Sequence, residues 1–281
     1  MFVGVAASPG QLFAAALDGA GPAATLLRVN SAGSVLTSCR RLGAAPVSMS
    51  DAASGLWLVG PASPATNASA VIRYSSSCAP QATTSLVGAV QVVAVPSGAW
   101  VLQASGSAPT ALTFLPVTGR ARSIARVLPA VGAAAFDVTP AGVATVAGQL
   151  GDGSVVAVTV NTVTGKVGTP VTLPRSGKPS VAATPAVVVG LQNPSTGGLV
   201  TVAGGQAQAL DVIPANSSVV AVAGGTRTWV VTASSTPGQL GVQLLTSSSA
   251  QVAGASDTPW LAATRTGAWL ASGSSLFSLR I

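Results

Sequence analysis

The stretch Val93–Val101, which reads VAVPSGAWV, decides the fold. A short apolar run leads into a Pro-Ser-Gly turn, and a second apolar run that carries a tryptophan follows at once. Pro and Gly set the backbone dihedrals of tight turns, and β-branched residues favour a pleated surface. We therefore predict two antiparallel strands joined by a hairpin turn.

The same pattern recurs along the whole chain. SGLWLV begins at Ser54 and SGAWVL begins at Ser97. Seven copies share this place in the repeat, at residues 9–13, 54–59, 97–102, 141–146, 185–189, 227–231 and 266–270. A period of roughly 40 to 45 residues, built from short strands, is typical of β-propeller blades. HEAT and armadillo repeats share this period but need amphipathic helices, and these units have none.

We therefore predict an all-β, seven-bladed β-propeller with mostly four-stranded antiparallel blades, forming one domain over residues 1–281. The expected blades span residues 1–43, 44–88, 89–131, 132–177, 178–215, 216–255 and 256–281. The expected inner strands are 2–7, 45–50, 90–95, 133–138, 180–184, 218–223 and 258–263. In the third blade we expect the outer strand at 122–128.

The last blade is expected to be incomplete, because its third strand ends with the sequence. Either a fourth strand comes from sequence upstream of Met1, or the blade has three strands. The first alternative fits a parent protein with a membrane anchor outside this chain.

Composition favours a sheet-rich protein with many turns. The chain is 48% hydrophobic and only 7% charged, and it contains 32 Gly and 19 Pro. The apolar segment Leu86–Leu102 approaches the length of a membrane-spanning helix, but Pro96, Ser97 and Gly98 interrupt it, so we interpret it as two strands. The N-terminus lacks the basic region of a signal peptide. If the protein is exported, its targeting segment has been removed.

The positive charge does not indicate a nucleic-acid site. The formal net charge is +7, yet the arginines are spread along the chain, and the only local cluster is Arg120, Arg122 and Arg126. Nucleic-acid sites gather basic residues on one face together with stacking aromatics. We therefore expect no nucleic-acid partner and a monomer in solution.

The residues needed for catalysis are scarce. The chain has no His, no Glu and one Tyr, so a Ser-His-Asp triad and a His/Cys zinc site lack their members. Its six Asp lie on different repeats without a paired-carboxylate spacing, and we expect Asp51, Asp152 and Asp257 at turns. We expect no catalytic, cofactor-binding or metal-binding residue and hence no enzyme.

Two sets of residues receive structural roles. Cys39 and Cys78 lie almost one repeat apart, and we expect a disulfide that joins neighbouring blades; the alternative is two buried thiols. A disulfide indicates an oxidising, extracytoplasmic compartment.

One repeat position holds tryptophan in four blades and Leu or Val in others, which indicates packing between blades rather than a ligand platform. These residues are Trp57, Trp100, Trp229 and Trp269. Trp260 falls out of this phase, on an inner strand.

The segment Val93–Val101 resembles the blades of virginiamycin B lyase-like and NHL-type propellers. In those blades an inner strand, a Pro/Asp-Gly turn and a Trp-bearing second strand occur in the same order. The lyase uses histidine and a metal, and this sequence has no histidine, so the resemblance implies the fold and not the activity. The Ala, Val, Gly, Thr and Arg bias is similar to that of uncharacterised secreted or membrane-anchored propellers of actinobacteria.

The leading functional hypothesis is a non-catalytic extracytoplasmic propeller that binds or scaffolds a protein or glycan of the cell envelope. Its ligand face is expected on the longer loops at residues 18–23, 61–68, 149–154 and 193–198. The alternative is a purely structural or assembly protein of an envelope or virion. A propeller lyase or hydrolase ranks below both.

Overall fold

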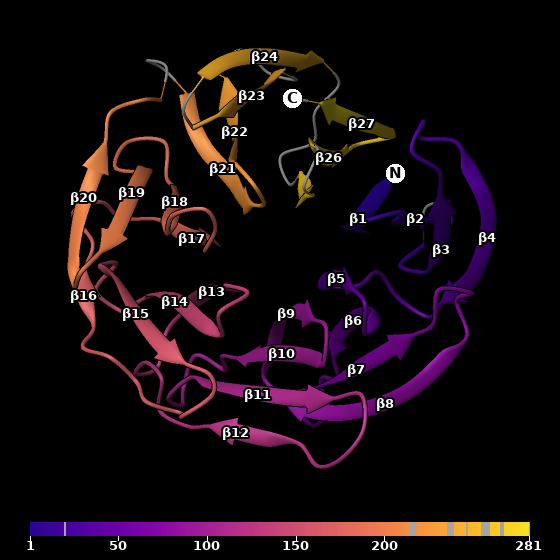
Figure 1. Ribbon diagram of the computed structural model, residues 1–281, viewed down its shortest axis with the longest axis horizontal. Coiled ribbons are helices and arrows are strands. Elements are labelled where there is room, and N and C mark those ends of the chain that lie inside the picture. Colours follow the sequence, from indigo (N-terminus) through magenta and orange to yellow (C-terminus); the bar gives the residue numbers. More distant parts are fainter. Residues whose placement is uncertain are drawn as a thin grey trace. The chain divides into compact units, whose positions relative to one another are not determined.

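A computed structural model describes residues 1–19, 21–213, 217–234, 239–245, 247–253, 259–264 and 267–280. All regular secondary structure in these ranges is β-strand, and the strands form seven antiparallel sheets. Figure 1 shows that each sheet is made of strands that follow one another in the sequence. The protein is a seven-bladed β-propeller whose blades have four strands each, except the last, which has three. Both features were predicted and are confirmed.

The chain divides into two compact units. The first comprises Met1–Ser105, Leu112–Ser123 and Trp260–Ile281, and the second comprises Gly106–Ala111 and Ile124–Pro259.

The first unit carries blades 1, 2, 3 and 7. Blade 1 consists of β1 (Phe2–Ser8), β2 (Gln11–Leu17), β3 (Ala24–Val29) and β4 (Val35–Leu42). Blade 2 consists of β5 (Ser48–Ala52), β6 (Gly55–Ala62), β7 (Ala68–Tyr74) and β8 (Pro80–Val87). Blade 3 consists of β9 (Ala89–Val95), β10 (Gly98–Gln103), β11 (Ala111–Pro116) and β12 (Arg122–Ile124). Blade 7 consists of β25 (Trp260–Ala263), β26 (Gly267–Ser272) and β27 (Ser275–Arg280).

The second unit carries blades 4, 5 and 6. Blade 4 consists of β13 (Ala133–Val138), β14 (Val143–Gln149), β15 (Val155–Asn161) and β16 (Val171–Thr172). Blade 5 consists of β17 (Lys178–Ala182), β18 (Val188–Gln192), β19 (Gly198–Ala203) and β20 (Gln206–Leu210). Blade 6 consists of β21 (Ser217–Gly224), β22 (Thr228–Ser234), β23 (Gln239–Leu244) and β24 (Ser247–Ala253).

The glycine before the tryptophan has a steric reason. Gly55 begins β6 with a φ of 109°, and a Cβ built there would lie 2.5 Å from the carbonyl oxygen of Tyr74 on β7. In blade 3, a Cβ at Gly98 would clash with the carbonyl oxygen of Leu115. The recurring Ser-Gly-x-Trp therefore keeps the second strand close to the third.

The hydrophobic core lies between neighbouring sheets. In the first unit, one cluster joins Phe13 and Leu26 of blade 1 to Leu56 and Leu58 of blade 2. In the second unit, another cluster joins blades 4 and 5. Within each unit, blades thus bury apolar faces against their neighbours, as a repeat that cannot bury that face alone must do.

Hydrogen bonds between blades join residues about one repeat apart. The Ser48 hydroxyl accepts the backbone N–H of Val92 at 3.0 Å, and the Ser54 hydroxyl donates to the carbonyl of Gly98 at 2.9 Å. Both pairs are 44 residues apart in sequence. The repeat period is therefore also the spacing of the polar contacts between blades.

Several predicted strand boundaries were wrong, among them the inner strand of blade 5, which was predicted at 180–184 but runs from Lys178 to Ala182. The inner strand of blade 2 was placed at 45–50, but β5 runs to Ala52, so Asp51 pairs with Leu56 inside the hairpin instead of capping a turn. The outer strand of blade 3 was extended to 128, but β12 ends at Ile124 because Arg126 takes a φ of 57°, which a strand does not accommodate. Leu128 instead donates its N–H to the Thr110 hydroxyl at 2.8 Å.

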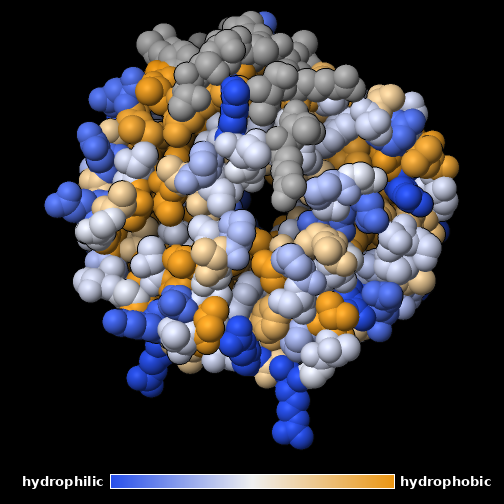
Figure 2. Space-filling view, in the orientation of Figure 1, coloured by the Kyte–Doolittle hydropathy of each residue, from blue (hydrophilic) through white to orange (hydrophobic). Residues whose placement is uncertain are grey.

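On the face shown in Figure 2, strongly hydrophilic side chains are scattered among pale and hydrophobic ones. No helix in the described part of the chain is long and apolar enough to cross a membrane.

Candidate functional site

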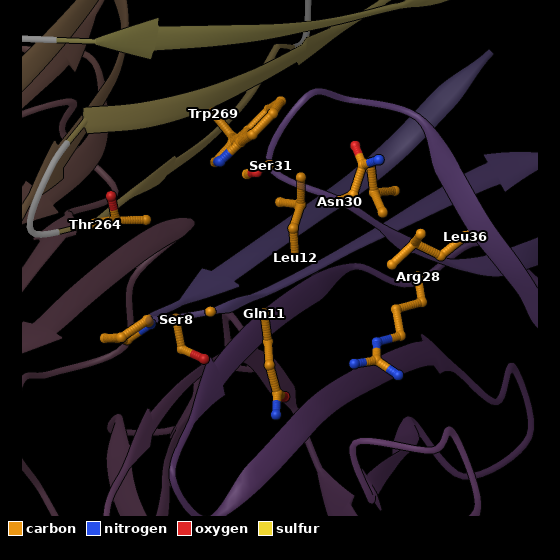
Figure 3. A pocket seen from close by; sticks show the side chains of 12 residues that line it. Ser8, Gln11, Leu12, Arg28, Asn30, Ser31, Leu36, Thr264 and Trp269 are labelled. Atoms are coloured by element: carbon orange, nitrogen blue, oxygen red, sulfur yellow. The ribbon is translucent and has the colours of Figure 1, made fainter.

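A cavity of about 560 Å³ in the first unit is the best candidate for a functional site. Its walls come from the β1–β2 turn, the end of β3, the β3–β4 turn and blade 7 (Figure 3). A volume of this size falls within the range of small-molecule sites in proteins, roughly 300–1,000 Å³.

The pairing of β2 with β3 gives the cavity two kinds of wall. Phe13 pairs with Arg28 and Leu12 pairs with Val29. Because side chains alternate along a strand, Gln11 and Arg28 emerge on one face of the sheet, and Leu12 and Val29 on the other. Gln11 and Arg28 extend in the same direction in Figure 3. The cavity at the end of this sheet is therefore bordered by the polar side chains of one sheet face and by the apolar side chains of the other.

The β3–β4 turn is held by Asn30. Its side-chain oxygen accepts the backbone N–H groups of Ala32 and Ser34, both at 2.9 Å. This Asx turn leaves the amide nitrogen of Asn30 as a donor at the cavity. The side chain thus shapes the wall and offers a polar group at the same time.

Trp269 closes the apolar side. Its side chain belongs to a cluster with Val5, Leu12 and Val29 of blade 1, and the residue is 8% exposed. A Cβ at Gly33 would lie 3.7 Å from Cζ3 of the indole, so the β3–β4 turn packs against the ring. Little of the indole face is therefore open to a ligand.

The described residues that line this cavity include no carboxylate, imidazole, amine, phenol or thiol. At its edge, the Ser8 hydroxyl donates to Oδ2 of Asp51 at 2.6 Å. Burial raises the pKa of Asp51, while the hydrogen bonds from Ser8 and the Ala52 N–H lower it. The described lining residues can therefore hold a ligand by hydrogen bonds, by apolar contacts and by the single positive charge of Arg28.

A second cavity of about 560 Å³ belongs to the second unit and is lined by Ser154, Arg175, Thr196 and Asp211 among others. The charge of its arginine is already paired. Arg175 forms an ion pair with Asp211 and donates to the carbonyl of Gly197 at 3.0 Å. The first cavity is the better candidate because its charge has no such partner among the described residues.

The structure places the predicted ligand loops only partly at these cavities. Ser154 and Thr196 come from two of the four loops and line the second cavity. The first cavity lies at the β1–β2 turn, the opposite end of β2 from the loop at 18–23. Among its wall residues, Arg28 gave no signal in the sequence, because nothing there shows which arginines lack a partner.

The predicted disulfide is confirmed. Cys39 of β4 is bonded to Cys78 in the β7–β8 turn, with an S–S distance of 1.97 Å. The bond joins blade 1 to blade 2, as expected from the spacing of the two cysteines.

The four in-phase tryptophans are all buried, with exposures of 2% for Trp57, 3% for Trp100, 5% for Trp229 and 8% for Trp269. Trp269 also lines the cavity. Trp260 is half-buried and packs against the apolar clusters on either side of blade 1.

Two of the charged residues considered at the sequence level fall elsewhere. Asp152 lies at a turn, where its carboxylate accepts the N–H of Ser154 at 2.9 Å. Asp257 lies outside the described residues. No group of three or more His, Cys, Asp or Glu side chains within the described ranges could hold a metal ion.

Solved structures share the fold over nearly the full chain. Hydrazine synthase of Kuenenia stuttgartiensis matches with a TM-score of 0.72 and 12% identity, covering 99% of this chain and 95% of that chain. Virginiamycin B lyase of Staphylococcus aureus matches with a TM-score of 0.65 and 12% identity, covering 100% and 94%. BamB of Moraxella catarrhalis matches with a TM-score of 0.54 and 11% identity, covering 99% and 96%.

These similarities show the fold and confirm the resemblance to virginiamycin B lyase-like propellers. No protein-family model and no curated protein sequence matches the chain.

Proposed function

We propose that this protein is a non-catalytic binding or scaffolding propeller that acts outside the cytoplasm, with a protein or a glycan of the cell envelope as its partner. The observation that carries the proposal is the cavity at the β1–β2 turn. Its described walls offer hydrogen-bond donors, one positive charge and apolar surface, but no acid–base pair.

Binding is the activity that such walls support. General acid–base catalysis needs a titratable side chain within hydrogen-bond reach of the substrate. The described wall residues include no such group, and their one charged side chain is that of Arg28. Its charge can hold an anionic group in place, and this binds a ligand without changing it chemically.

The Cys39–Cys78 disulfide supports the location. Disulfides persist in oxidising compartments and are rare where thiols are kept reduced.

The fold by itself does not distinguish a binding protein from an enzyme, so the residues of the site must decide. The solved structures of this fold named above include a synthase, a lyase and BamB. Propellers host unrelated functions, so function must be argued from particular residues. Here those residues are the walls of the cavity.

The experiment uses the full chain with its disulfide intact. We expect saturable binding to the cell-envelope fraction of the source cells or to members of a glycan array, and little binding to the cytosolic fraction. The bound partner is recovered and compared by mass spectrometry before and after incubation.

An unchanged partner supports the proposal. A partner that is cleaved or rearranged at a rate proportional to protein concentration shows an enzyme and contradicts it, as does the absence of any saturable binding. The reduced protein is the control for disulfide integrity.

A further inference from the structure

We propose that the cavity at the β1–β2 turn binds the free C-terminal carboxylate of a peptide with apolar last residues, and that Arg28 holds the carboxylate. This inference rests on the proposed function and names the chemistry of its partner.

The first argument is the state of Arg28. Within the described part of the chain, Arg41 pairs with Asp18 at 3.1 Å, and Arg175 pairs with Asp211. Arg73 lies over the ring of Trp57. No such partner accompanies Arg28, although it is half-buried. A guanidinium that is partly removed from water gains most from a carboxylate, which it can bind with two parallel N–H···O bonds.

The second argument is the surrounding set of donors. The side-chain amides of Gln11 and Asn30 and the hydroxyl of Ser31 line the same cavity. The side-chain oxygen of Asn30 accepts two hydrogen bonds within the turn, so its amide nitrogen is the group that it can offer a ligand, as a donor. Donors beside a cation favour an anionic or carbonyl-bearing ligand over a cationic one.

The third argument is the apolar wall, which selects a peptide over a sugar. Leu36, which is 55% exposed, is the apolar side chain that a ligand can reach at the rim, whereas Leu12 and Val29 also line the cavity but are each only 4% exposed. Trp269 is only 8% exposed and presents almost no open ring face on which a pyranose could stack. A carboxylate attached to an apolar body matches this combination better than an acidic sugar does.

The size of the cavity limits the ligand. A volume of about 560 Å³ suits a group of about three residues, well within the range of small-ligand sites. We therefore expect recognition of a chain end and not of a long internal segment.

The test is isothermal titration of the full protein with three probes of matched length. The probes are N-acetyl-Ala-Val-Leu as the free acid, the same peptide as its C-terminal amide, and trigalacturonic acid. We expect the free acid to bind at least tenfold more tightly than the amide, because the amide loses the charge-assisted bonds to Arg28. We expect trigalacturonic acid to bind more weakly than the free-acid peptide.

Three variants test which residues cause the difference in affinity between the free acid and the amide. Arg28→Gln is expected to abolish the preference for acid over amide. Arg120→Gln makes the same charge change at an exposed residue away from the cavity and is expected to keep it. Leu36→Ser is expected to weaken acid and amide alike. Thermal unfolding checks that each variant is folded.

Equal affinity for acid and amide, no measurable binding of either peptide, or tighter binding of trigalacturonic acid overturns the inference. So does an Arg28→Gln variant that keeps the preference while folded. If the envelope partner still binds Arg28→Gln as tightly as the unchanged protein, the inference fails while the proposed function stands. If no envelope component binds either protein, the proposed function fails.

Discussion

The carboxylate of Asp137 on β13 accepts the backbone N–H of Ala183, in the next blade, at 2.8 Å. Ser50 on β5 makes the equivalent contact with the N–H of Ala94 at 2.9 Å. Asp137 and Ser50 hold the same position relative to the hairpin that follows each inner strand. An ionisable group in blade 4 therefore does what a neutral hydroxyl does in blade 2, and this makes one contact between blades sensitive to pH.

Asp137 is predicted to make the protein less stable as the pH rises from about 4 to about 7. Burial raises the pKa of Asp137 from 3.8 to about 6, against the lowering effect of the N–H groups of Ala183 and Val138. Over this range the folded protein retains a proton that the unfolded chain releases, so the free energy of unfolding falls with pH by about 3 kcal/mol. Denaturant titrations at several pH values should show a steeper fall in the unchanged protein than in Asp137→Asn, where only groups such as Asp51, whose pKa is also raised, still contribute in this direction.

Asp152→Asn is the matched control for that series. Hydrogen bonds from Ser154 lower the pKa of this exposed carboxyl, so its contribution has the opposite sign and is lost on acidification. A pH profile of Asp137→Asn identical to that of the unchanged protein would contradict the assignment to Asp137.

Ser54→Ala is predicted to destabilise the protein by about 1–3 kcal/mol, because two buried groups lose their partner. The Ser54 hydroxyl donates to the carbonyl of Gly98 at 2.9 Å and accepts the indole N–H of Trp57 at 3.1 Å. The control is Ser97→Ala, since Ser97 holds the same motif position in blade 3 but is exposed. Chemical denaturation should show a change within about 0.5 kcal/mol for Ser97→Ala. Equal effects of the two substitutions would contradict the role given to Ser54.

Gly55→Ala is predicted to lower the free energy of unfolding by more than Gly10→Ala does. Both glycines have positive φ, which costs an L-residue about 1–2 kcal/mol. A Cβ at Gly10 meets open space, whereas at Gly55 it meets the Tyr74 carbonyl at 2.5 Å. Paired thermal melts measure the difference, and an equal loss in both variants would show that the clash has no energetic weight.

Removing the disulfide is predicted to lower the free energy of unfolding by about 4 kcal/mol in the chain-entropy model, given the sequence separation of 39 between Cys39 and Cys78. The double variant Cys39→Ser, Cys78→Ser should match the reduced protein in denaturant titrations. A reductant should change the unchanged protein and leave the double variant as it is. Two free thiols in protein purified without reductant would contradict the bond.

The sequence predicted the features that repeat, because a repeated feature is visible many times. The Ser-Gly-x-Trp hairpins revealed the blades, and the near-repeat spacing of Cys39 and Cys78 revealed their bond. The outer strand of blade 3 was predicted too long because its end depends on the positive φ of Arg126, which no local pattern announces.

The cavity was missed for a similar reason. Arg28 is one of many dispersed arginines in the sequence, and only the fold shows that others have partners and this one has none among the described residues. The sequence pattern predicts packing for Trp269, and no feature of that pattern indicates that one edge of the packing borders a cavity.

The hydrogen bonds between blades also bear on the order in which the chain can fold. Ser48 and Val92 are 44 residues apart, so their contact can form as soon as the second of two successive blades has been synthesised. Phe2 differs, because its N–H donates to the carbonyl of Gly273 at 2.6 Å and joins blade 1 to blade 7. Contacts between residues close in sequence form faster than those between distant ones. During synthesis from the N-terminus, the N–H of Phe2 therefore lacks this partner until residues near 270 have been made.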